Sequence, residues 1–151
     1  MDSTDKKLLA LLAKDATLSG TELGEMIGLS VPAVNKRIAK LRESGAVSRF
    51  TVITDKKQMQ KPVTAFILLV LQYGEAVDKL MKTVEDDKDV LECYAITGEY
   101  DYIIKICASS VEALEEKLLK LKKQKGVIKS HTMLSLMEHK FEASVLPDNE
   151  E

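Results

Sequence analysis

Between Ser19 and Gly45 the sequence encodes two amphipathic helices separated by only about three residues. The first helix begins with Ser19-Gly20-Thr21-Glu22, the spacing of a capping box in which each polar side chain bonds the other residue's free backbone N–H. Gly28 lies in the turn, where a sharp reversal needs the positive φ that glycine adopts without strain. The pattern predicts a helix-turn-helix. The residues expected to be buried on its first helix are Leu23, Met26 and Ile27.

The second helix has the periodicity of a segment that packs on one side. Its apolar positions recur at spacings of three and four, at Val31, Val34, Ile38 and Leu41. Ser30 lies at the N-cap position, Pro32 in the first turn, and Gly45 where a left-handed helix end is expected. An earlier helix, from about Asp2 to Lys14, is expected to bury Leu8, Leu9, Leu11 and Leu12. Three helices around one small core are therefore predicted.

The opposite side of the second helix carries small, amide and basic side chains. Asparagine can pair bidentately with adenine and arginine with guanine, while lysine neutralises phosphate. This chemistry predicts a DNA-binding face that comprises Ser30, Pro32, Ala33, Asn35, Lys36, Arg37 and Lys40. The helix by itself leaves a second interpretation open, which is an ordinary solvated face with charged residues.

Charge is divided unevenly along the chain. The whole chain has a net charge of −2, which is unusual for a protein that binds a polyanion. Residues 1–61, however, contain 11 Lys and Arg against 7 Asp and Glu, a net +4, whereas residues 62–151 contain 11 against 17, a net −6. The asymmetry indicates that the first part of the chain meets DNA and that the second part has another task.

Residues 48–61 are predicted to be a linker or hinge. Ser48–Thr54 alternates as a short strand does, and a polar stretch then leads to Pro62. A single strand between domains needs a partner for its N–H and C=O groups, and the same strand of a second copy is a candidate partner.

The remaining chain, residues 62–146, alternates strands and helices in the order βαββαβ. Strands are expected over 63–71, 90–97, 102–108 and 127–137, and helices over 75–84 and 111–123. The predicted fold class is α+β. A three-helix, winged or extended helix-turn-helix domain (residues 1–47) precedes a ferredoxin-like domain. Residues 147–151 are predicted to be a disordered acidic tail.

Several classes of protein are disfavoured. The longest apolar run, residues 65–71, is too short to span a bilayer, and the N-terminus lacks a signal-peptide pattern, so a cytoplasmic protein is expected. Cys93 and Cys107 are isolated and are expected to be free thiols. His131 and His139 lie in no spacing typical of a nucleophile or a metal cage. Neither an enzyme nor a cofactor nor a metal site is expected.

A set of short motifs occurs in a fixed order and spacing over nearly the whole chain: Met1–Asp5, Gly28-Leu29-Ser30, Val34, Arg37, Leu41, Gly45, Thr97–Tyr102 and Lys125-Gly126-Val127. In this order and spacing the chain resembles the Lrp/AsnC family of prokaryotic transcription regulators, also called feast/famine regulatory proteins. The resemblance implies a helix-turn-helix joined by a strand to a ferredoxin-like ligand-sensing domain. It also implies dimers that pair through their sheets, and often four dimers in a ring.

Three positions depart from the family pattern. Thr17 stands where the family often has Arg, Gln60 where Gly is frequent, and Lys125 where Pro is frequent. None of them lies on the expected DNA-binding face, but Gln60 and Lys125 affect the geometry of the hinge and of a loop.

In the family the effector, commonly an amino acid, binds between sensing domains near the glycine-rich link. Carried over by position, the resemblance implies an effector site that includes Gly98, Glu99, Tyr100, Asp101, Thr132 and Leu134. Asp101 would hold the ammonium group, and backbone N–H groups near Gly98 would bind the carboxylate. The alternative is a tight hairpin chosen for its turn chemistry, with Tyr100 at an oligomer contact.

The predicted function is therefore a sequence-specific regulator that binds double-stranded DNA as a homodimer, or as an octamer of four dimers. A small effector would change its oligomeric state or its DNA affinity. The alternative is an architectural, nucleoid-type protein that wraps DNA without an effector. A site-specific regulator should prefer its specific site over other DNA by a factor of at least about 10³, and a wrapping protein should not.

Overall fold

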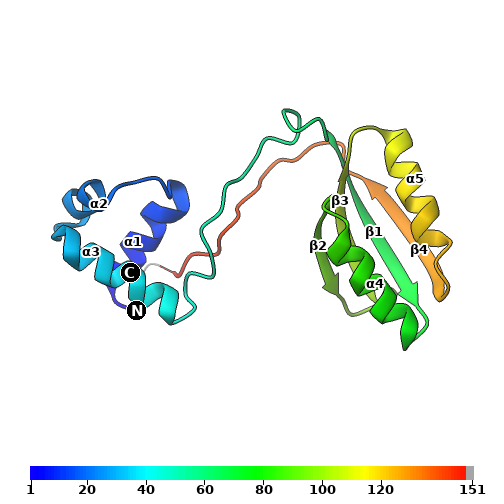
Figure 1. Cartoon of the computed structure of the whole chain (residues 1–151), viewed down its shortest axis with the longest axis horizontal. Coiled ribbons are helices and arrows are strands. Elements are labelled where there is room, and N and C mark those ends of the chain that lie inside the picture. Colours follow the sequence, from blue (N-terminus) through cyan, green and yellow to red (C-terminus); the bar gives the residue numbers. More distant parts are fainter. Residues whose placement is uncertain (149–151) are drawn as a thin grey trace. The chain divides into compact units, whose positions relative to one another are not determined.

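The computed structural model describes residues 1–148 and divides into two compact units (Figure 1). The helical unit comprises Met1–Val52 together with residues 139–148. The sheet unit comprises Ile53–Glu138. The chain therefore passes between the units twice.

Three helices form the body of the helical unit: α1 (Ser3–Lys14), α2 (Gly20–Ile27) and α3 (Val31–Glu43). The predicted capping box of Ser19 and Glu22 is confirmed, and Gly28 ends α2 with a φ of 72°. Gly45 follows α3 with a φ of 78°, as expected. No described residue before Val63 belongs to a strand, so this unit has no wing.

The core of the helical unit is small and apolar. Its buried residues are Leu8, Leu12, Leu23, Val34 and Leu41, with Leu9, Leu11, Ile27 and Ile38 partly buried around them. Two predictions of burial are wrong, because Met26 is 58% and Val31 39% exposed. The helix α2 has only two turns, and Leu23 alone among its large side chains is fully buried, so Met26 lies outside the core. Val31 is the first residue of α3 and lies against Gly20 at the edge of the unit.

The sheet unit has the predicted βαββαβ order. Its elements are β1 (Val63–Leu71), α4 (Glu75–Asp86), β2 (Val90–Ala95), β3 (Tyr102–Ala108), α5 (Val111–Lys122) and β4 (Val127–Leu134). All neighbouring strands are antiparallel, in the order β2-β3-β1-β4. This is the ferredoxin-like arrangement, and the fold class is α+β.

The two faces of the sheet differ in what covers them. On one face Ala65, Ile67, Leu69 and Leu71 are buried with Leu80 of α4 and with Leu114 and Leu121 of α5, so both helices lie on that side (Figure 1). The alternate residues of β1, which are Thr64, Phe66, Leu68 and Val70, define the opposite, open face. Their partners in register include Ile103, Lys105, Lys129, His131 and Met133. The β1 residues of the open face remain partly exposed in a single chain.

The final strand is shorter than expected, since β4 ends at Leu134 and not at Met137. The backbone N–H of Ser135 still donates to Thr64 O at 2.9 Å. Two residues before Thr64, Pro62 has no N–H to offer, so the ladder between β1 and β4 cannot continue.

The linker forms a turn and not a strand. Residues 48–54 make no strand in the single chain, where no second strand supplies partners for their backbone groups. Residues 55–61 form a helical turn in which Asp55 Oδ1 accepts from the N–H of Gln58 at 2.8 Å. The turn ends with Gln60 in the left-handed region, at a φ of 57°, and with the N–H of Lys61 donating to Lys56 O. The departure at Gln60 thus falls where glycine would be unstrained.

Residues 139–148 belong to the helical unit. They have no regular secondary structure, and the carbonyl of Asp148 accepts a hydrogen bond from Lys6 Nζ at 3.1 Å. Residues 149–151, the rest of the tail predicted to be disordered, lie outside the described residues.

Candidate DNA interface and effector site

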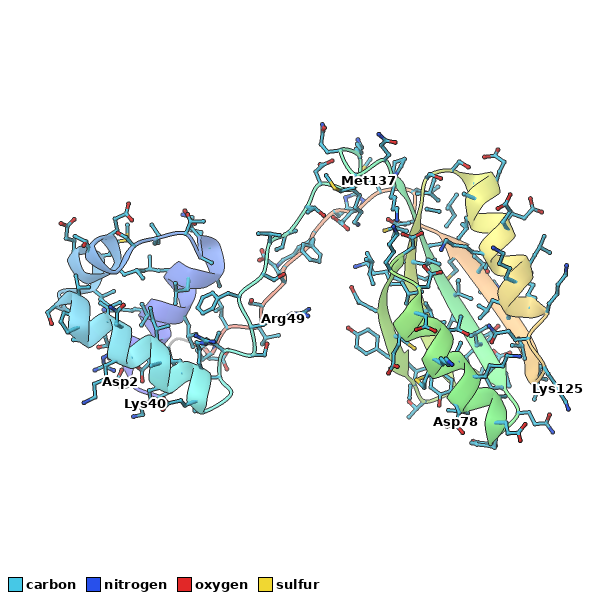
Figure 2. The ribbon with its side chains drawn as sticks, viewed as in Figure 1. Asp2, Lys40, Arg49, Asp78, Lys125 and Met137 are labelled. Atoms are coloured by element: carbon cyan, nitrogen blue, oxygen red, sulfur yellow. The ribbon has the colours of Figure 1, made fainter. Side chains whose placement is uncertain are left out.

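The outward face of α3 presents a small cationic surface. Asn35, Lys36 and Lys40 are exposed, and the two lysines lie on the same side of the helix because they are four residues apart. Figure 2 labels Lys40 on this helix. Neither lysine forms an ion pair within residues 1–148. Their ammonium groups are thus available to phosphates, and the Asn35 amide lies beside them on the same helix.

The start of α3 adds a second polar feature. Ser30 has N-cap backbone geometry, with φ −71° and ψ 153°, but its side chain makes no capping hydrogen bond. Pro32 follows it in the first turn, and Ala33 is partly buried. The first N–H groups of the helix point away from its body, an arrangement that suits an anionic DNA backbone.

The turn between α2 and α3 depends on a glycine that the sequence analysis missed. Gly24 is buried in α2, and a Cβ built on it would lie 2.4 Å from the carbonyl oxygen of Leu29. The N–H of Leu29 donates to Gly24 O at 2.9 Å. A glycine within a helix pattern, five residues before the turn's end, was the available signal of this close approach.

Arg37 does not extend freely from α3. Its Nη1 atom lies 2.7 Å from Asp2 Oδ2 and 2.6 Å from Asp5 Oδ1, both at the start of α1. The backbone N–H of Asp5 and the Arg37 guanidinium hold the pKa of Asp2 below its ordinary value. The two carboxylates in turn raise the pKa of Arg37. Arg37 is half-buried and lies three residues after Val34 and four before Leu41, so it borders the buried stripe, whereas the sequence analysis placed it on the outward face.

The link between β2 and β3 is fastened to the end of β1. The N–H of Asp101 donates to Leu69 O at 2.8 Å, and Asp101 Oδ2 accepts from the N–H of Leu71 at 2.9 Å. Gly98 has a φ of 113°, a conformation that favours glycine. Asp101 also borders a depression of about 200 Å³, whose other lining residues are Leu71, Tyr73, Val77, Ala95, Ile96 and Tyr102.

The same link reaches β4. Glu99 forms an ion pair with Lys129, which lowers the pKa of Glu99 and raises that of Lys129. Lys129 Nζ lies 4.8 Å from the centre of the Tyr100 ring, and the His131 ring centre lies 6.3 Å from it. Lys129 and His131 were missed by the sequence analysis, because only the strand register brings them beside the link.

Thr132 and Leu134 are not brought to the link in a single chain. They pair with Ile67 and Ala65, whose side chains lie on the helix-covered face, whereas Lys129 and His131 lie on the open face. Leu134 pairs with Ala65, which lies four and six residues before Leu69 and Leu71, the two residues that bond Asp101; this separation is roughly 13–20 Å along a strand. The Thr132 hydroxyl oxygen is buried and has no hydrogen-bond partner within the described chain.

Residues 1–148 contain no group of three or more His, Cys, Asp or Glu side chains placed to hold a metal ion. None of the helices in this range is both long and apolar enough for a membrane crossing.

Comparison with known proteins identifies the family. A model of the AsnC-type helix-turn-helix domain matches residues 1–42, and a model of the Lrp/AsnC ligand binding domain matches residues 64–145. The HTH-type transcriptional regulator FL11 of Pyrococcus furiosus is 34% identical over 150 residues, which cover 97% of this chain and 96% of that protein. The chain belongs to the Lrp/AsnC family.

Two further proteins are similar to this Lrp/AsnC protein, one in sequence and one in structure. The regulatory protein AsnC of Haemophilus influenzae is 30% identical over 118 residues, which cover 78% of this chain and 79% of that protein. A transcriptional regulator of Neisseria meningitidis, solved in complex with L-methionine, superposes with a TM-score of 0.92, at 26% identity and 96% coverage of both chains. The protein is thus a transcription regulator with a DNA-binding helix-turn-helix and a ligand-binding domain, and it is not an enzyme.

Proposed function

We propose that this regulator binds specific DNA sites and that a free amino acid controls its assembly or its DNA affinity. The observation that carries the proposal is the exposed face of α3, which presents Asn35 together with Lys36 and Lys40, two lysines that form no ion pair with any described residue. Asparagine has the donor and acceptor that adenine requires, and the lysines supply phosphate contacts that hold the helix in the groove. Ser30, Pro32 and Ala33 complete the proposed contact surface at the start of α3.

A dimer is the proposed DNA-binding form. The open face of the sheet presents Phe66, Leu68 and Val70 in its centre, and an apolar surface of this kind is stabilised when a second copy covers it. A two-fold dimer would place two α3 helices in successive major grooves, about one helical turn or a multiple of it apart, on a roughly palindromic site. Association of four dimers in a ring is the larger assembly that we propose.

The effector is proposed to lie at the link between β2 and β3. Asp101 supplies a carboxylate for an ammonium group, and Leu71, Val77 and Tyr102 supply apolar walls for a side chain. The relative from Neisseria meningitidis was solved with L-methionine, which has both features. Because Thr132 and Leu134 lie away from Asp101 in one chain, a site that includes all of them needs residues from two sensing domains.

Control of DNA binding then follows from linkage. An effector that binds one assembly more tightly than another shifts the protein toward that assembly. The DNA affinity changes to the extent that the assemblies differ in the spacing of their α3 helices, and bound DNA must change the effector affinity by the same factor.

Selection from randomised DNA tests the contacts of α3. The variant Asn35→Ala should lose preference at one base position and keep it elsewhere, since one bidentate pair is removed. An unchanged preference would exclude Asn35 as a base contact. A preference of wild type for its best site below about 10³ would instead support a wrapping protein.

Salt titration tests the phosphate contacts. Lys36→Ala and Lys40→Ala should each weaken binding to all sequences and lower the slope of log affinity against log salt by about 0.9. Lys125→Ala is the matched control, because Lys125 is an exposed lysine of the sheet unit (Figure 2). If all three variants keep the wild-type slope, α3 does not contact phosphate.

Calorimetric titration with free amino acids tests the effector site. Asp101→Asn keeps an oxygen that can accept from Leu71 N–H but removes the charge that would hold an ammonium group. We expect binding to weaken by at least about tenfold, because a charged partner is lost. Equal affinity of wild type and Asp101→Asn would remove Asp101 from the site.

A further inference from the structure

We infer that Arg37 is a positioning residue for DNA recognition, which sets the orientation of α3 through Asp2 and Asp5 and does not itself contact a base. The inference rests on α3 being the DNA-contacting helix. It assigns to Arg37 a task different from that of the basic residues beside it on the same helix.

The three side chains form a closed network, here called the Arg37 cluster. Asp2 Oδ1 accepts from the N–H of Asp5 at 2.8 Å, and Asp5 Oδ2 accepts from the N–H of Asp2 at 3.1 Å. The remaining oxygens, Asp2 Oδ2 and Asp5 Oδ1, are the two that accept from Arg37 Nη1. Each carboxylate therefore uses one oxygen to begin α1 and the other to hold α3. Asp2 and Asp5 thus both cap the start of α1 and bind a side chain of α3.

Burial shows that the Arg37 cluster belongs to the body of the unit. Asp5 is 5% exposed and is the one charged residue that is buried in the described chain, while the Arg37 side chain is 31% exposed. If Arg37 turned outward to a guanine, the Asp5 carboxylate would lose its cationic partner while still shielded from water. Leaving a buried charge unpaired is strongly unfavourable, so the cluster opposes that rotation.

The architecture explains why such a connection is needed. The backbone of α3 approaches α2 closely, and α1 also approaches α2, but close approaches between α1 and α3 are sparser. The angle between α1 and α3 therefore depends on side chains, namely Leu8 and Val34 in the core and the Arg37 cluster at the surface. Lys36 precedes Arg37 directly and Lys40 follows it by three residues, so a small rotation of α3 moves both relative to DNA. Contact groups held a fraction of an ångström from their best positions lose most of their effect.

Neutralising Asp2 or Asp5 distinguishes a positioning role from simple electrostatics, because the two predict opposite changes in DNA affinity. Asp2→Asn keeps a good N-cap residue but weakens the connection to Arg37, and Asp5→Asn does the same from the buried side. Simple electrostatics predicts tighter DNA binding, because a negative charge leaves the helical unit. The positioning role predicts binding weakened by about tenfold on every sequence, with unchanged base preference. Glu25→Gln is the matched control, since Glu25 is an exposed carboxylate of the same unit outside the cluster.

The full chain is measured by DNA titration, by selection from randomised sites, and by hydrogen exchange of the α3 amides to show that each variant is folded. Arg37→Gln should reproduce the phenotype of Asp5→Asn, and the double variant should be no worse than either single variant, because all three break the same network. Arg37→Lys should recover part of the affinity, since it keeps the charge but not the geometry.

Three results would overturn the inference. The first is an altered preference at one base position in Arg37→Gln alone. The second is a DNA affinity of Asp2→Asn and Asp5→Asn that equals or exceeds that of Glu25→Gln. The third is additivity of the two single effects in the double variant. If Lys40→Ala also leaves DNA affinity unchanged, the DNA-binding role of α3 fails. If Lys40→Ala weakens binding and the aspartate variants do not, only the positioning role fails.

Discussion

A single methyl group at position 24 should destabilise the helical unit. In an ordinary helix interior the change from glycine to alanine gains about 1 kcal/mol. In Gly24→Ala, however, the new Cβ would lie 2.4 Å from the carbonyl oxygen of Leu29, whereas ordinary contacts begin at 3.4 Å. The backbone of the turn must therefore move by about 1 Å, and it is held by the hydrogen bond from Leu29 N to Gly24 O.

The magnitude follows from these opposing terms. Overpacking of this kind costs about 1–3 kcal/mol, and weakening the Leu29 hydrogen bond adds about 1 kcal/mol. After the helical gain of about 1 kcal/mol, a net loss of about 1–3 kcal/mol remains. For a unit of this size each 1 kcal/mol lowers the midpoint of thermal unfolding by about 4–8 °C. A decrease of roughly 5–20 °C is expected for the helical unit.

Scanning calorimetry with hydrogen exchange measures this effect, because exchange separates the amides of α2 and α3 from those of the sheet unit. Gly20→Ala is the matched control, since its Cβ would meet only movable side-chain atoms, Val31 Cγ1 at 3.1 Å and Asn35 Oδ1 at 3.4 Å. The control should change the midpoint little, and the sheet unit should be unaffected in both variants. If Gly24→Ala unfolds at or above the wild-type temperature, the turn is not fixed by this close approach.

Three further outcomes are expected. Gln60→Gly should stabilise the sheet unit by up to about 1 kcal/mol in urea unfolding, because the left-handed backbone at φ 57° strains a residue with a Cβ; a lower midpoint would contradict this. Leu80→Ala, at a core position that is 1% exposed, should lower the free energy of unfolding of that unit by about 2–5 kcal/mol in the same assay. The pKa of Asp2 is lowered in the folded protein, so the ionised carboxylate stabilises the fold at pH values above its ordinary pKa of 3.8. This contribution is lost as the pH falls through the lower, folded pKa. Acidification should thus lower the thermal midpoint of the helical unit more in wild type than in Asp2→Asn, and equal decreases would refute it.

Local signals in the sequence predicted most of the helical unit. The capping box of Ser19 and Glu22 and the positive φ of Gly28 follow from interactions within a few residues, and both are confirmed. Burial was predicted less well, because periodicity gives the direction of a side chain but not what lies opposite it. Met26 shows the difference, since α2 is too short for its whole apolar side to be covered.

Contacts between residues far apart in the sequence were not predicted. The order of the strands followed from the βαββαβ pattern, but the approach of Lys129 and His131 to Tyr100 depends on the register of β4 on β1. The partners of Arg37 lie 32 and 35 positions away in the sequence, and no local pattern connects them. Residues 48–54 alternate as a strand does but form none in the described chain, and their pairing with a second copy stays a prediction.

The chain passes between the units near Val52 and again near Glu138, so residues 139–148 form a second covalent connection between them. At the border of the sheet unit an ion pair of 2.7 Å between Lys56 and Glu138 joins the two passages. A single proteolytic cut in residues 48–52 would therefore leave the helical unit attached through its contacts with the tail, including the bond from Lys6 to Asp148. The two fragments would then be held together only by the contacts of residues 139–148 with the helices. Their dissociation constant would therefore measure how strongly this segment binds the helical unit.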